Sequence, residues 1–161
     1  SKEFDEYLHS VESYTNSHDC YLALRGLRTL QVRLSAHQNS AFEIARWLET
    51  EDIVDCVIHP GLESHPQYNL WKRDYSGASG LFAFTFKETY SDKQIALFIN
   101  SLEMFGLGYS WGGFKSLVTA RQYKRDGKWV HDGKHLIRLN IGHEDTKDLI
   151  SDIKSSFSTL N

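Results

Sequence analysis

The sequence lacks the features that would tie it to a membrane, a nucleic acid or the secretory pathway. No run among its 161 residues approaches the ~18 apolar residues of a membrane span, and the first 20 residues are polar and acidic, unlike a signal peptide. The net charge is only −3, and lysine and arginine form no run longer than two, so no basic surface for nucleic acid is expected. We therefore predict a cytoplasmic protein with neither a membrane nor a nucleic acid as partner.

Cysteine is scarce too, and the histidines form no clear ligand set. Cys20 and Cys56 are too few to staple a domain of this size, so we expect free thiols in a reducing compartment. The closest metal-like spacing joins His131 and His135. Gly133 lies between them and predicts a turn, which would not keep both imidazoles on one helix face. We predict no metal site.

The usual catalytic signatures are missing. The GASG segment at 77–80 is not followed by Lys-Ser/Thr and leads into a strand pattern, whereas phosphate-binding loops of the Walker and Rossmann types open a helix. No Ser-His-Asp set and no paired carboxylates stand out. The residues alone therefore indicate a binding patch without catalytic machinery.

What the sequence does contain is an alternation of helical and strand patterns. Apolar residues at intervals of three and four predict a long amphipathic helix over 27–49, with Gly26 at a kink or a helix junction. The other expected elements are a loop at 61–80, helices at 91–102 and 144–160, and strands at 53–58, 81–86, 104–110 and 135–142. Together they predict an α/β fold class, with a small open sheet, mixed or mainly antiparallel, and helices packed on one face.

One of the strand patterns contains a cation. Arg138, in LIRLNIG, shares a strand face with Leu136 and Asn140, because side chains alternate between faces. A buried guanidinium without an anion is unfavourable. Arg138 is thus expected to pair with an internal carboxylate, to point outward from an edge strand, or to bind a substrate carboxylate with its planar fork.

The segment YSWGG at 109–113 is unusual for either a core strand or a simple turn. Ser110 offers a hydroxyl and a backbone N–H, and the two glycines permit close approach of a ligand or a positive φ. Tyr109 and Trp111 supply apolar walls with polar tips. The segment is either part of a ligand pocket or an aromatic strand end that turns through a Gly-Gly bend.

Five segments, taken in order, resemble the carboxy-terminal part of bacterial cystathionine β-lyases, which belong to the pyridoxal-phosphate-dependent Cys/Met metabolism family. The resemblance covers nearly the whole chain. The segments are DCYLALRGLRTLQVRLSAHQNSAFEIARWL (19–48), HPGL (59–62), WKRDYSGASGLFAF (71–84), YSWGGFKSL (109–117) and LIRLNIGHEDTKDLISDI (136–153).

This resemblance implies a domain organisation. Residues 19–161 would be the small, carboxy-terminal domain of the aspartate-aminotransferase-like fold type I, of α+β type. Residues 1–18 would be a remnant of the connection from a cofactor domain that the chain lacks. No lysine of this chain lies in the family's Schiff-base setting, and Lys72 would lie on an outer loop. No catalytic and no cofactor-binding residue is therefore expected here.

The resemblance also implies residue roles. Arg138 and Ser110 would bind the α-carboxylate of the amino-acid substrate, and Trp111 would line the same pocket. Tyr109 would lie where the substrate side chain is distinguished. Trp111 favours a β-lyase, because the γ-synthases and γ-lyases of the family usually carry Ser-Leu-Gly-Gly at this place.

The implied reaction is β-elimination of cystathionine to homocysteine, pyruvate and ammonia in methionine biosynthesis. The full-length enzyme would be a homotetramer that binds pyridoxal 5'-phosphate. The present chain would be inactive and would bind no cofactor by itself. Two alternatives remain open: the same domain of a cystathionine γ-synthase or γ-lyase, or a non-catalytic half of a split enzyme.

Overall fold

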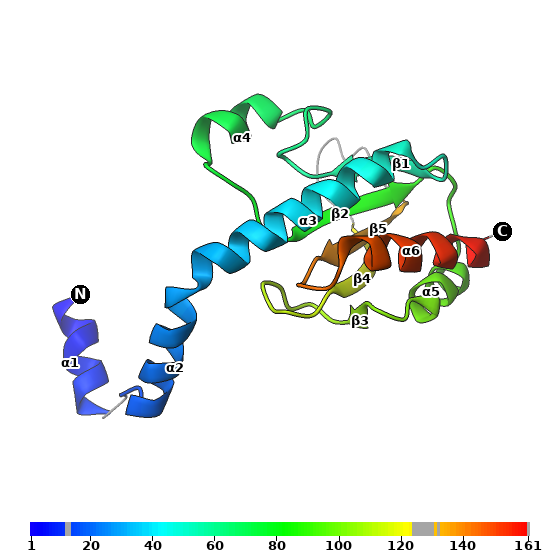
Figure 1. Ribbon diagram of the computed structural model, residues 1–161. Helices are drawn as coiled ribbons and strands as arrows, with labels where there is room; N and C mark the ends of the chain where they lie inside the picture. The colour runs from blue at the N-terminus through cyan, green and yellow to red at the C-terminus, as the bar shows by residue number, and fades with distance from the viewer. Residues whose placement is uncertain (12–13, 124–130, 132, 161) are drawn as a thin grey trace. The chain divides into compact units, whose positions relative to one another are not determined.

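The computed structural model of the chain describes residues 1–11, 14–123, 131 and 133–160. It divides into two compact units, Ser1–Arg33 and Leu34–Asn161, and the helix α3 begins in the first unit and continues in the second (Figure 1). Within the described residues, no helix is both long enough and apolar enough to cross a membrane. The domain boundary expected at 18/19 stays a prediction.

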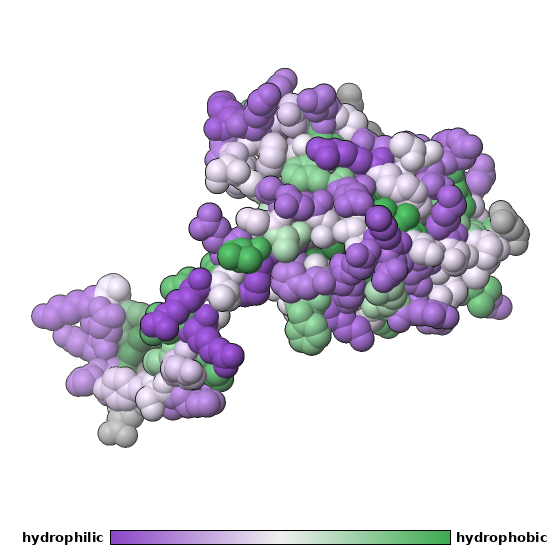
Figure 2. Space-filling model, viewed as in Figure 1, coloured by the Kyte–Doolittle hydropathy of each residue, from purple (hydrophilic) through white to green (hydrophobic). Residues whose placement is uncertain are grey.

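The first unit consists of helices without a core of their own. Its elements are α1 (Lys2–Ser10), α2 (Ser17–Arg28) and the start of α3 (Leu30–Thr50). Neither α1 nor α2 has a buried residue, and hydrophobic residues lie on the surface of these helices among hydrophilic ones (Figure 2). The apolar side chains of α1 and α2 are therefore not buried by any other described residues.

The junction between α2 and α3 differs from the expected one. The sequence predicted one helix from residue 27 and a junction at Gly26, but the helix breaks at Thr29. The backbone N–H and Oγ1 of Thr29 both donate to the carbonyl of Gly26 at 3.3 Å, and Nη2 of Arg33 donates to the same oxygen at 2.8 Å. Gly26 thus takes part in the junction through its carbonyl while it lies inside α2.

The second unit is built on a five-stranded mixed sheet with the order β1-β2-β5-β4-β3. β3 runs parallel to β4, and the other neighbours are antiparallel. The strands are β1 (Val54–Ile58), β2 (Leu81–Phe86), β3 (Gly106–Leu107), β4 (Leu117–Gln122) and β5 (His135–Asn140). The predicted mixed or mainly antiparallel sheet is confirmed, and so is the interior position of β2.

Three expectations about single elements were wrong. β4 was not predicted, because its sequence LVTARQ is half polar and shows only a short alternation. The strand expected over 104–110 is limited to β3, since the chain leaves the sheet after Gly108 donates to the carbonyl of Val118 at 3.3 Å. The expected loop at 61–80 contains α4 (Tyr68–Asp74), which buries no residue and so gave no amphipathic signal.

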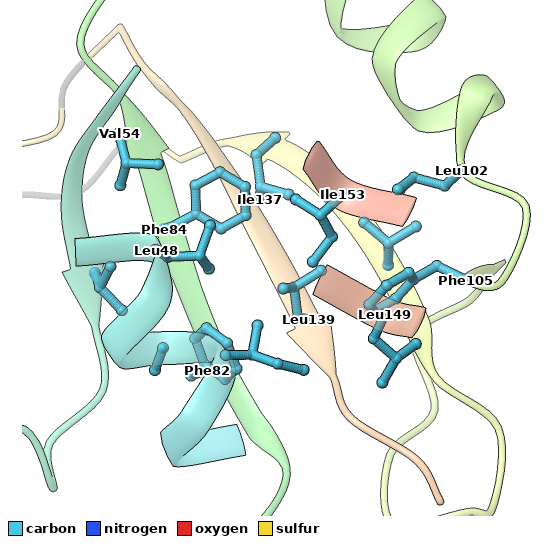
Figure 3. Packing of buried hydrophobic residues seen from close by; sticks show 14 of the residues in the cluster. Leu48, Val54, Phe82, Phe84, Leu102, Phe105, Ile137, Leu139, Leu149 and Ile153 are labelled. Carbon is cyan, nitrogen blue, oxygen red and sulfur yellow. The ribbon is translucent and has the colours of Figure 1, made fainter. Parts of the chain in front are cut away.

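The core lies between one face of the sheet and the helices α3, α5 (Asp92–Ser101) and α6 (Thr146–Ser156). A 3-10 turn, η1 (Phe157–Leu160), closes the same cluster. The helices that build the core thus lie on one face, as predicted (Figures 1 and 3). The strand and helix residues labelled in Figure 3 include Leu48, Phe82, Phe84, Ile137, Leu139, Leu149 and Ile153.

Candidate functional site

The candidate site begins with Arg138 in the middle of β5. Ile137 and Leu139 point into the core, with 0% and 1% exposure, so the alternation of a strand places Arg138 on the opposite face. Its neighbours in register are Ala83 on β2 and Thr119 on β4. Both have short side chains, which leaves room for a guanidinium over the sheet.

Arg138 contacts the loop that precedes β4. Its Nη1 and Nη2 both donate to the carbonyl oxygen of Tyr109, each at 3.0 Å. Within the described part of the chain no carboxylate pairs with Arg138, and three of the five N–H donors of its guanidinium have no partner there. The side chain therefore lies next to the Tyr109–Ser110 peptide with donors still available.

Asn140 holds the same loop two residues further along β5. Its side chain is 2% exposed, and its Oδ1 accepts the backbone N–H of Gly112 at 3.0 Å, while its Nδ2 has no partner among the described residues. Gly112 has φ +76°, a conformation that favours glycine. A Cβ there would meet nothing within 4 Å, so backbone conformation, not space, requires this glycine.

The base of the loop is tied down by a second polar cluster. Ser116 donates from its backbone N–H and its Oγ to the carboxylate of Glu144, with the Oγ contact at 2.7 Å. Ser116 Oγ in turn accepts the N–H of Gly142 at 2.8 Å, and the N–H of His143 donates to the carbonyl of Phe114 at 2.7 Å. The segment after β5 thus anchors the end of the loop.

The outer part of the loop is open to solvent. Tyr109, Trp111 and Phe114 are 56%, 66% and 78% exposed, and Ser110 is exposed without a described hydrogen bond. The guanidinium of Arg121 lies over the Tyr109 ring, 5.0 Å from its centroid. The structure therefore brings Arg138, Tyr109, Ser110 and Trp111 to one place and leaves apolar surface beside them.

Sequence reasoning missed the residues that support this loop. Asn140 had a usable signal, because it shares a strand face with Arg138 and neighbours it at the next outward position. Arg121, Ser116 and Glu144 had none, since their contacts join segments that are distant along the chain. These contacts depend on the unpredicted strand β4.

The GASG segment does not form a binding site for the phosphate of pyridoxal phosphate. In the GASG segment, a Cβ at Gly80 would lie 2.4 Å from the carbonyl oxygen of Ile141, and one at Gly77 would lie 2.7 Å from Oε1 of Gln38. The N–H of Ala78 already donates to that same Oε1 at 2.6 Å. These glycines are packed against protein, so they offer no open cradle to a phosphate.

The thiols are no better candidates for chemistry. Cys20 is exposed and Cys56 is half-buried, and both are free, as predicted. Burial raises the pKa of the Cys56 thiol, and the neighbouring Asp55 carboxylate adds to the shift. A thiol with a raised pKa carries less of the nucleophilic thiolate.

Comparisons with known proteins give consistent matches. Residues 2–158 match the family described as "Cys/Met metabolism PLP-dependent enzyme". The chain is 41% identical to an L-alanine/L-glutamate racemase of Wolbachia pipientis wMel over 92% of its length, and 39% identical to the cystathionine β-lyase MetC of Escherichia coli K12 over 87%. These alignments cover 39% and 37% of the two relatives.

A solved structure shows the same arrangement. The cystathionine γ-synthase from Xanthomonas oryzae pv. oryzae, in complex with aminoacrylate and cysteine, superposes with a TM-score of 0.73 at 31% identity. The superposition covers 89% of this chain and 38% of that one. The chain thus spans well under half the length of the proteins it matches.

Proposed function

Because the chain belongs to the Cys/Met metabolism family of pyridoxal-phosphate-dependent enzymes, we propose that it is the substrate-carboxylate-binding domain of a cystathionine β-lyase. The longer protein would convert cystathionine to homocysteine, pyruvate and ammonia, and would act in the cytoplasm as a homotetramer. The observation that carries this proposal is the position of Arg138, with unpaired N–H donors, beside the Tyr109–Ser110 peptide.

In this proposal Arg138 and Ser110 bind the α-carboxylate of the substrate. A bidentate arginine–carboxylate pair contributes about 1.5–3 kcal/mol and fixes both the position and the plane of the carboxylate. Fixing that group also fixes the directions of the bonds at the adjacent Cα, which determines the bond that is broken. Trp111 would form a wall of the pocket, and Tyr109 would contact the substrate side chain.

The proposal assigns cofactor binding and substrate binding to different parts of the longer protein. Pyridoxal phosphate supplies the electron sink for the reaction, and the residues that hold it would belong to the remainder of the longer protein. The present residues bind and orient the substrate. The 161-residue chain would therefore show no turnover by itself, which can be measured as pyruvate release from cystathionine in the presence of added cofactor.

Two other reactions are supported by specific similarities. The γ-synthase structure favours chemistry at the γ carbon, and the 41% identity to a racemase favours inversion at Cα. Trp111 after Ser110 favours the β-lyase over the γ enzymes, because the γ-synthases and γ-lyases of the family usually carry Ser-Leu-Gly-Gly at this place.

Product analysis of the full-length protein distinguishes these reactions. With cystathionine we expect pyruvate and homocysteine in excess over 2-oxobutyrate and cysteine, and with L-alanine we expect little D-alanine. Predominant 2-oxobutyrate would replace the proposal by a γ-lyase, and rapid D-alanine formation without pyruvate would replace it by a racemase. A gene that encodes no cofactor domain in frame with this chain would favour the split enzyme.

A further inference from the structure

A cavity of about 460 Å³ lies between α5 and the outer edge of β4. Ile95, Ile99 and Ala120 supply apolar lining, and Asn100 and Gln122 supply amide groups. Its volume is within the range of small-molecule sites in proteins, about 300–1,000 Å³. Nothing in the proposed function uses this cavity.

The cavity lies at β4 because β3 covers only the beginning of that strand. The two residues of β3 pair with Leu117 and Val118, and the remaining residues of β4 have no described partner on that side. Leu107, at the end of β3, is 77% exposed and also lines the cavity. The cavity therefore occupies the place where a longer β3 would have continued.

Two charged groups at the cavity differ in how they are satisfied. Asp92 Oδ1 contacts Nε2 of His135 at 2.9 Å; the His135 side chain is only 9% exposed, whereas the Asp92 side chain is 92% exposed. Arg121 also lines the cavity, but within the described residues it has no ion pair. Asp92 thus contacts His135 from a solvent-exposed position, and the strong donor available to a ligand is the Arg121 guanidinium.

Arg121 also lies against an aromatic side chain. Its guanidinium lies 5.0 Å from the centroid of the Tyr109 ring. A guanidinium over an aromatic face keeps N–H donors that can bind an anion, so a ligand need not displace Tyr109. The lining accordingly matches a molecule with an anionic end and an apolar chain.

We propose that this cavity binds small carboxylates that carry an unbranched apolar chain. The carboxylate accepts from Arg121, and the chain lies on Ile95, Ile99 and Ala120. The binding site does not rest on the proposed function of the Arg138 site. Where both hold, an occupant would act on the substrate loop through the stacked pair of Arg121 and Tyr109.

The test is a titration of the 161-residue chain with sodium hexanoate, followed by two-dimensional ¹H–¹⁵N NMR at constant ionic strength. We expect saturable shifts of amides in α5 and β4. Acetate lacks the chain and n-hexylamine lacks the carboxylate, so each should bind at least about tenfold more weakly.

Two variants and two matched controls assign the site. Arg121→Ala removes the donor and Ala96→Phe fills the cavity from an exposed helical position, and each should weaken hexanoate binding about tenfold or more. Arg46→Ala removes another arginine stacked on a ring, 5.3 Å from Phe42, and Leu97→Phe enlarges an exposed residue of α5 that does not line the cavity. Both controls should bind as the unmodified chain does.

The outcomes are distinct. Shifts that persist unchanged in Arg121→Ala and Ala96→Phe, or equal binding of hexylamine, would overturn the proposal. The absence of saturable shifts would also overturn it. So would shifts that change with protein concentration alone and are not affected by hexanoate, because a second copy of the chain would then occupy the cavity. Because no cofactor or turnover is involved, failure here leaves the product analysis of the full-length enzyme unaffected.

Discussion

The two faces of β5 place different demands on neighbouring residues. Ile137 and Leu139 are almost completely buried against the helices, whereas Arg138 and Asn140 hold the loop on the other face through its backbone. One strand therefore supplies both the core and the candidate site. Substitutions on the first face should change stability, and those on the second should change ligand binding.

The largest expected effect is on the core face. Ile137→Ala should lower the free energy of unfolding by about 2–5 kcal/mol, because it leaves a cavity in a closely packed core. Arg138→Ala should lower it by less than about 1 kcal/mol, since it removes a half-exposed side chain. Urea unfolding of the two variants measures both values, and equal losses would remove the distinction between the faces.

The next effect concerns the backbone of the loop. Gly112→Ala should cost about 1–2 kcal/mol, because an L-residue is strained at positive φ. Gly113→Ala is the matched control, since a Cβ at either glycine would meet no atom within 4 Å and, of the two, only Gly112 has a positive φ. Comparable unfolding free energies for the two variants would mean that the Asn140–Gly112 contact does not fix the loop.

A smaller effect concerns the dependence of stability on pH. His59 is 2% exposed, and burial lowers its pKa below the ordinary value of 6.5. The unfolded chain therefore binds this proton more readily than the folded chain does. The contribution of His59 to stability is fully present above about pH 6.5, and it is lost as the pH decreases from there toward the pKa of His59 in the folded chain. The contribution of one proton to the slope is at most about 1.4 kcal/mol per pH unit.

His59→Asn tests this assignment, because asparagine can still accept the N–H of Gly61, which now donates to Nδ1 of His59 at 3.0 Å. Urea unfolding between pH 7.5 and 5 should show a shallower pH dependence than the unmodified chain. His65 and His131 also have lowered pKa values caused by burial, so the dependence should not vanish. An unchanged slope would assign the acid sensitivity to those histidines.

The same comparison explains which features the sequence could predict. The alternation in LIRLNIG placed Arg138 on one strand face with Leu136 and Asn140, but it did not determine whether that face meets an internal carboxylate, the solvent or a ligand. Strongly apolar strands such as β2 were found by the same alternation. β4 and α4 were not predicted because they bury few apolar side chains, so the periodicity of apolar residues in their sequences is weak. The contacts of Arg138, Asn140 and Arg121 with the loop depend on strand order and register, which local patterns do not determine.

The most direct test of the Arg138 site is the kcat/KM of the full-length enzyme for cystathionine after Arg138→Lys. Lysine keeps the charge but loses the planar fork, so we expect kcat/KM to fall about 10- to 100-fold. The matched control Arg46→Lys should stay within about twofold of the unmodified enzyme, since Arg46 lies over Phe42 and has no role in the proposed site. An Arg138→Lys enzyme with unchanged kcat/KM would contradict the binding of the substrate carboxylate by Arg138.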